Sequence, residues 1–142
     1  MAKVLVADDE RGICDAFSTF LTEEGHEPLL ASSGPEAVVL VREQKPAVAF
    51  LDVRMPGGDG IDALDEIRAI APQMPVIIMT AYGTLETARR AMDLGAFDYL
   101  GKPVDLAQLR KLLSRALHRP KAAAPATPAS APEPDRPTLI GQ

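Results

Sequence analysis

Four short apolar segments of the sequence each end in a polar side chain that could do chemistry. In chain order these side chains belong to Asp8 and Asp9, Asp52, Thr80 and Lys102. Short apolar runs closed by turn residues are typical of strands buried on both faces of a parallel sheet. The carboxyl ends of parallel strands lie at one edge of the sheet, where open α/β folds keep their binding sites. We therefore expect acids, a hydroxyl and an ammonium group to converge there.

The chemistry that such a set supports is phosphoryl transfer. Crowded carboxylates repel one another unless a cation joins them, and hard oxygen ligands favour Mg²⁺. A lysine, a hydroxyl and a divalent cation would together hold the oxygens of a phosphoryl group. Taken singly, each acid and the lysine is more often a solvated loop charge, and Thr80 a strand-favouring residue. Their expected convergence is what predicts a phosphorylation site.

The composition fits one globular domain with an aliphatic core and a tail. The chain has 142 residues, of which 46% are hydrophobic and 4% aromatic. A net charge of −5 without a basic stripe argues against direct contact with nucleic acid. The single cysteine, Cys14, cannot form an internal disulfide. No apolar run approaches the roughly 20 residues that span a bilayer, and the first residues are unlike a secretory signal. We expect a protein of the cytoplasm that makes no membrane contact.

Strand and helix patterns alternate five times. The expected strands cover residues 3–7, 26–31, 48–52, 75–81 and 96–103. The segments with helical periodicity cover 11–24, 34–45, 60–71, 84–94 and 105–117. This alternation implies right-handed crossovers and a doubly wound parallel sheet of the α/β class. The flavodoxin-like (βα)5 order 2-1-3-4-5 would place Asp8, Asp9 and Asp52 in one crevice.

Several helix ends carry recognisable signals. Capping boxes are predicted at Ser33–Glu36 and Asp105–Gln108, and Asp59 is the expected N-cap of the third helix. Gly25 and Gly95 are expected to end the first and fourth helices. These signals set the boundaries of the elements that carry the site.

The composition changes abruptly after residue 119. Residues 120–137 are dominated by Pro and Ala, which cannot form a packed core, so we expect an extended linker there. Residues 138–142 are apolar again and could begin a further domain. The expected organisation is a domain over 1–119, a linker over 120–137 and the start of an output domain at 138–142.

The motifs at the strand ends resemble the receiver (CheY-like) domain of two-component response regulators. They are Asp8-Asp9, the run 51–56 (LDVRMP), the run 79–83 (MTAYG) and the run 97–103 (FDYLGKP). The wording of the last two is most like receivers of the NtrC family, in which a receiver controls an AAA+ ATPase acting on σ54 polymerase. Residues 139–142 are similar to the opening of that ATPase. Gly58 departs from the large residue that the family usually has in this loop.

The resemblance implies a role for each site residue. Asp52 would be the phosphoacceptor, served by a sensor histidine kinase or a small donor such as acetyl phosphate, with Lys102 and Thr80 contacting the phosphoryl group. Mg²⁺ would be held by the carboxylates of Asp8, Asp9 and Asp52 and by the backbone carbonyl of Arg54. The chain would then be no enzyme beyond its own phosphorylation and dephosphorylation.

The resemblance also implies how the signal leaves the site. Thr80 and Tyr99 would act as switch residues, while Arg54 and Tyr82 would tune the lifetime of the phosphoryl group. The face formed by segments 84–94, 96–103 and 105–117 would change shape, form a homodimer and control the output ATPase domain. The small residues of 84–94 would make that movement easy, and a cis Lys102–Pro103 peptide is expected.

Other interpretations remain open from the sequence. The chain could be a stand-alone receiver or phosphorelay intermediate, or an unphosphorylated receiver that only dimerises. An aspartyl-phosphate hydrolase of the haloacid dehalogenase type is disfavoured, because its Asp-x-Asp after the first strand is absent. Tyr99 could equally be ordinary edge-strand packing. Among the remaining side chains, we expect Glu10 to be a helix N-terminal charge, Cys14 a core or boundary residue, and His26 and His118 surface residues.

Overall fold

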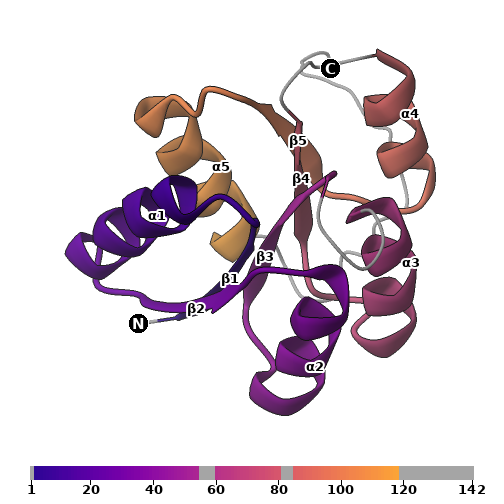
Figure 1. Ribbon diagram of the computed structural model, residues 1–142, viewed down its shortest axis with the longest axis horizontal. Coiled ribbons are helices and arrows are strands. Elements are labelled where there is room, and N and C mark those ends of the chain that lie inside the picture. The colour runs from indigo at the N-terminus through magenta and orange to yellow at the C-terminus, as the bar shows by residue number, and fades with distance from the viewer. Residues whose placement is uncertain (1, 55–59, 81–84, 119–142) are drawn as a thin grey trace, which may run out of the picture.

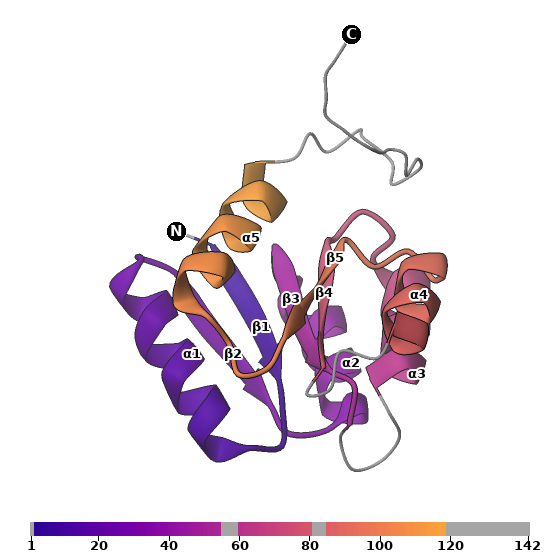
Figure 2. The same ribbon diagram turned by 90° about the horizontal axis from the view of Figure 1, so that it is seen from above.

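A five-stranded parallel sheet with helices on both faces forms the protein (Figures 1 and 2). The computed structural model describes residues 2–54, 60–80 and 85–118. The strands are β1 (Lys3–Ala7), β2 (Glu27–Ala31), β3 (Val48–Asp52), β4 (Val76–Thr80) and β5 (Asp98–Gly101). The helices are α1 (Arg11–Glu23), α2 (Gly34–Gln44), α3 (Gly60–Ile70), α4 (Leu85–Asp93) and α5 (Leu106–His118). The strand order is β2-β1-β3-β4-β5, so the predicted α/β fold and its topology are confirmed.

The register of the sheet places the polar side chains at the strand ends level with one another. Ala7 of β1 pairs with Leu51 of β3, so the residues that follow them, Asp8 and Asp52, leave adjacent strands at the same height. Thr80 of β4 pairs with Gly101 of β5, and Lys102 follows directly. The expected convergence at one edge of the sheet therefore follows from the pairing.

The core lies in two apolar clusters, one on each face of the sheet. Because side chains alternate along a strand, Val4 and Val6 belong to the cluster that includes residues of α1 and α5, whereas Leu5 belongs to the cluster that includes residues of α2, α3 and α4. Figure 2 shows the same division, with α1 and α5 on one side of the strands. Aliphatic residues fill most of both clusters, and Phe17 and Phe50 meet edge-on with their ring centroids 5.4 Å apart.

The helix ends largely follow their sequence signals. The Ser33 side chain caps α2 by accepting from the backbone N–H of Glu36 at 3.2 Å. The second hydrogen bond of the predicted capping box differs. Glu36 Oε1 accepts from the backbone N–H of Ser32 at 2.8 Å, and not from that of the cap residue Ser33. Gly25 and Gly95 have the expected positive φ, 86° and 97°. Asp59, the predicted cap of α3, lies outside the described residues.

One helix differs from the sequence-based expectation in detail, and another follows it. Leu106, predicted on the buried stripe of α5, is 51% exposed, because it opens the helix before the helix meets the sheet at Leu109. The buried positions of α4 include Ala88 and Ala91, in keeping with its small-residue pattern. The predicted linker and output segment lie outside the described residues, and no helix among those described could cross a membrane.

Candidate functional site

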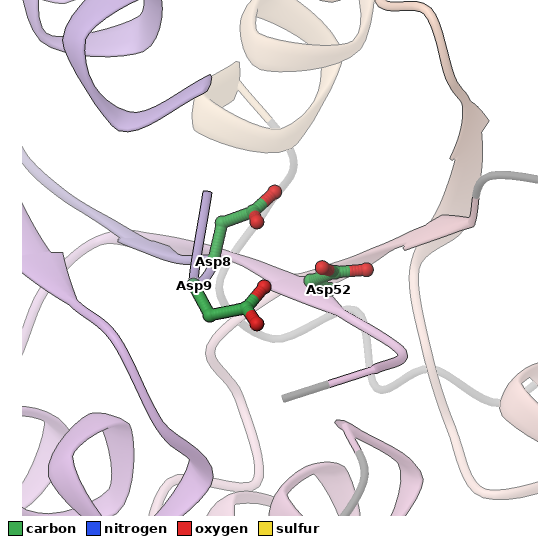
Figure 3. A group of neighbouring side chains, drawn as sticks. All are labelled: Asp8, Asp9 and Asp52. Atoms are coloured by element: carbon green, nitrogen blue, oxygen red, sulfur yellow. The ribbon is translucent and has the colours of Figure 1, made fainter. Parts of the chain in front are cut away.

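Three carboxylates meet at the carboxyl edge of the sheet. Asp8 and Asp9 extend from the end of β1 and Asp52 from the end of β3, toward a common space (Figure 3). One oxygen of each lies within 4.8 Å of the others. Asp8 and Asp52 are buried, and Asp9 is exposed. Two buried like charges at this separation are costly without a positive partner.

Lys102 supplies part of that positive charge. Its Nζ lies 2.8 Å from Asp8 Oδ2, 3.2 Å from Asp52 Oδ2 and 3.2 Å from Glu10 Oε1. The backbone N–H of Lys102 donates to the carbonyl of Thr80 at 2.9 Å, and the Lys102–Pro103 peptide is cis, as expected. These contacts fix both ends of the lysine, so that its ammonium group lies among the acids.

Glu10 is the residue of this site that sequence reasoning missed. It was expected to be only a charge at the N-terminus of α1, yet its carboxylate contacts Lys102, which is 92 positions away in the sequence. Its backbone N–H also donates to Asp8 Oδ1 at 2.9 Å, in the turn between β1 and α1. The run of three acids that begins at Asp8 was the available signal.

Each of the two buried acids also accepts a hydrogen bond from a neighbouring residue. Asp52 Oδ1 accepts from the backbone N–H of Arg54 at 3.4 Å. The thiol of Cys14, at the boundary of the core as expected, donates to the backbone carbonyl of Asp8 at 3.2 Å. Asp8 Oδ2 is buried and accepts no hydrogen bond among the described residues, so its contact with Lys102 is ionic rather than directional.

The ionisation of the site shows that one ammonium group does not balance the acids. Burial, and then the charge of Asp8, raise the pKa of Asp52 to about 6, although Lys102 acts in the opposite direction. Burial alone would lower the pKa of Lys102, but Asp8 and Asp52 raise it above its usual range. Oxygens of three carboxylates lie close together, and one buried oxygen, Asp8 Oδ2, accepts no hydrogen bond among the described residues. The site therefore fits a hard divalent cation.

The remaining predicted residues lie around this centre. Thr80 is buried at the end of β4, one residue beyond Met79, which pairs with Asp52. Arg54 is exposed two positions after Asp52, and the Tyr99 side chain is 43% exposed on β5. Tyr82 lies outside the described residues. The structure thus brings Thr80 to the same sheet edge as the acids and leaves Tyr99 at the surface.

Gly60 packs against the backbone of Asp52. It opens α3, is buried, and donates its N–H to the carbonyl of Val53 at 2.7 Å. A Cβ atom at this position would collide with the backbone carbonyl of Asp52. The absence of a side chain therefore allows α3 to begin against the strand end that carries Asp52.

Together, the fold and the strand-end acids with their lysine have the arrangement of a receiver domain. Residues 4–114 match the model of the response regulator receiver domain, and the chain belongs to this family. The resemblance drawn from the sequence motifs, including its NtrC-like wording, is confirmed.

Individual relatives agree with this assignment. The transcriptional regulatory protein ZraR of Escherichia coli is 44% identical over 130 residues, which are 89% of this chain and 30% of ZraR. Sporulation initiation phosphotransferase F of Bacillus subtilis is 34% identical over 81% of this chain and 93% of its own length. The solved receiver domain of NtrX from Brucella abortus has a TM-score of 0.76 and 36% identity, covering 80% of this chain and 97% of that one. The chain spans less than a third of ZraR.

Proposed function

We propose that Asp52 accepts a phosphoryl group from a sensor histidine kinase in the presence of Mg²⁺, and that this event controls an output domain. One observation carries the proposal: the Asp8, Asp9 and Asp52 carboxylates lie together, with the Lys102 ammonium 3.2 Å from Asp52. The proposed acceptor, its counter-ion and the acids proposed to bind the cation therefore share one edge of the sheet. Membership of the receiver family supports the same function.

In the transfer step, an oxygen of Asp52 forms a bond to phosphorus. The bond between phosphorus and the donor breaks, and the donor leaves with the electron pair: an imidazole nitrogen of the kinase histidine, or an acetate oxygen when acetyl phosphate is used. Lys102 would then pair with a phosphoryl oxygen, and the Thr80 hydroxyl would donate to another. When bound by Asp8, Asp9, Asp52 and the Arg54 carbonyl, Mg²⁺ supplies positive charge that offsets the repulsion between the anionic donor and the anionic acceptor.

The signal would leave through the face formed by α4, β5 and α5. Thr80 at the end of β4 and Tyr99 on β5 are the proposed switch residues, with Arg54 and Tyr82 tuning the lifetime of the phosphoryl group. The groove between β5 and α5 carries both charges, since Asp98 Oδ2 lies 3.4 Å from an Arg115 nitrogen. A mixed-charge face that retains an exposed aromatic side chain suits a homodimer contact.

For the output, we propose an ATPase domain in cis that acts on σ54-dependent transcription, joined through the Pro/Ala-rich segment 120–137. The similarity to the transcriptional regulator ZraR supports this proposal. We also propose that the protein acts in the cytoplasm and turns over no substrate other than its own phosphoryl group. Sequence beyond Gln142 that encodes no ATPase would contradict the proposed output.

A phosphorelay intermediate is the second candidate. Sporulation initiation phosphotransferase F is matched over 93% of its length, so a receiver can exist with little else attached. In that case Asp52 would pass its phosphoryl group to a histidine of another protein. Transfer from the labelled chain to a histidine phosphotransfer domain would distinguish the two candidates.

The deciding experiment is incubation with acetyl phosphate and Mg²⁺, followed by intact-mass measurement. We expect one phosphoryl group, labile to base and to hydroxylamine, on each wild-type chain and none on Asp52→Asn. The matched control is Asp65→Asn, which changes an exposed acid of α3 and should label normally. Steady release of phosphate far above one equivalent would favour a hydrolase, and labelling of the Asp52→Asn variant would refute the acceptor assignment.

A further inference from the structure

The Lys102 ammonium forms ion pairs with three carboxylates. Its partners are Asp8 at 2.8 Å, Glu10 at 3.2 Å and Asp52 at 3.2 Å. An ammonium group carries three donors and no acceptor. The side chain of Lys102 is only 11% exposed, so water has little access to it. Before any phosphoryl group arrives, the ammonium therefore already has an ion pair with Asp8 and hydrogen bonds to Glu10 and Asp52.

The three partners differ in how readily they can let the lysine go. The side chain of Asp8 is 0% exposed and that of Asp52 is 7% exposed, whereas that of Glu10 is 62% exposed. A buried carboxylate that loses its counter-ion is strongly destabilised, because no water replaces the ammonium. An exposed carboxylate returns to water with little change in free energy. Glu10 is therefore the contact that breaks most easily.

We propose that Glu10 is a positioning residue of the phosphorylation site, which holds Lys102 in the unphosphorylated state and releases it when a phosphoryl oxygen takes its place. The inference rests on the proposed phosphorylation of Asp52. The backbone of Glu10 is fixed by the hydrogen bond to Asp8 Oδ1, so the side chain can swing out while the turn remains in place. Glu10 acts only through Lys102.

The proposal gives a direction for the rate of phosphorylation. While Glu10 holds the ammonium group, it competes with the incoming phosphoryl oxygen, and its charge repels an anionic donor. Removing that charge should raise the rate of Asp52 labelling about 2- to 5-fold, the range expected from an exposed ion pair. Glu10→Ala, which removes the acceptor altogether, should act at least as strongly as Glu10→Gln.

The test compares wild type, Glu10→Gln and Glu10→Ala at saturating Mg²⁺. The matched control is Glu24→Gln, because Glu24 makes an exposed pair with Arg110 at 3.2 Å at the other end of α1. The first measurement is the labelling rate as a function of acetyl phosphate concentration. The second is the ¹⁵N resonance of the Lys102 ammonium group, recorded without metal or donor, which reports on the ion pair independently of phosphorylation.

We expect both Glu10 variants to label faster and to shift the Lys102 resonance, and Glu24→Gln to do neither. A shifted resonance with an unchanged or slower labelling rate would overturn the release step. An unshifted resonance would overturn the ion pair itself. If wild type cannot be labelled at all, the proposed function fails, and the resonance still shows whether Glu10 holds Lys102.

Discussion

Replacing Asp52 by Asn should stabilise the metal-free protein near neutral pH. Asp52 is 5% exposed, and its carboxylate shares Lys102 with two other acids. Burial and the charge of Asp8 raise its pKa from 3.8 to about 6, so the folded state disfavours the ionised form. Asparagine has nearly the same shape without the charge. Removal of the proposed acceptor should therefore strengthen the fold.

The size of the effect follows from the difference in proton binding between the folded and unfolded states. Between pH 3.8 and about 6 the folded chain binds more protons at Asp52 than the unfolded chain, so stability falls as the pH rises through this window. A shift of about two units corresponds to about 3 kcal/mol in favour of Asp52→Asn at about pH 8. At about pH 4.5, where folded Asp52 is mostly protonated, the advantage shrinks to about 1 kcal/mol.

Urea unfolding in the presence of a metal chelator measures this difference directly. Wild type and Asp52→Asn are compared at about pH 8 and about pH 4.5, with Asp65→Asn as the control that should change stability little at either pH. If Asp52→Asn were less stable than wild type at pH 8, or if its advantage were independent of pH, the inferred cost of ionising the buried Asp52 carboxylate beside Asp8 would be wrong.

Three further predictions follow from the same contacts. Mg²⁺ should raise the thermal midpoint of wild type at about pH 8 and much less at about pH 5, because a protonated Asp52 is a poor ligand. Calorimetry measures the midpoints, with Asp52→Asn as the control. A Mg²⁺-induced shift of the wild-type midpoint that did not depend on pH would contradict this prediction. Gly60→Ala should lower the free energy of unfolding by about 1–3 kcal/mol, because its Cβ would meet the Asp52 carbonyl, and equal urea midpoints would contradict the close approach. Leu109→Ala should cost about 2–5 kcal/mol and Leu106→Ala less than about 0.5 kcal/mol, since the first side chain is fully buried and the second exposed; similar losses would mean that α5 packs differently.

Much of the fold could be predicted because the local signals agreed with one another. Apolar runs bounded by turn residues gave the strands, and their alternation with helical patterns gave the parallel order. That order is enough to bring Asp8 and Asp52 to one edge, because Ala7 and Leu51 pair in the sheet. The capping role of Ser33 was likewise local and was confirmed.

The differences arise where a side chain reaches beyond its own element. Glu10 meets Lys102 from 92 positions away, and no local pattern reports how far an exposed carboxylate extends. Leu106 fits the apolar stripe of α5, but the periodicity does not show where the helix first meets the sheet. Glu36 bonds Ser32 instead of the cap residue, since the path of the chain before the helix decides which N–H is within reach.

The hydrogen bond from the backbone N–H of Lys102 to the carbonyl of Thr80 has a consequence for how this molecule can respond. This bond joins the last residue of β4 to the residue that follows β5, so the Thr80 hydroxyl and the Lys102 amine are carried by directly hydrogen-bonded main-chain segments. A displacement of Thr80 would therefore be passed to β5, which carries Tyr99 three positions before Lys102. Modification of Asp52 would then change the α4, β5 and α5 face through a small displacement of the whole of β5, without a series of side-chain rearrangements.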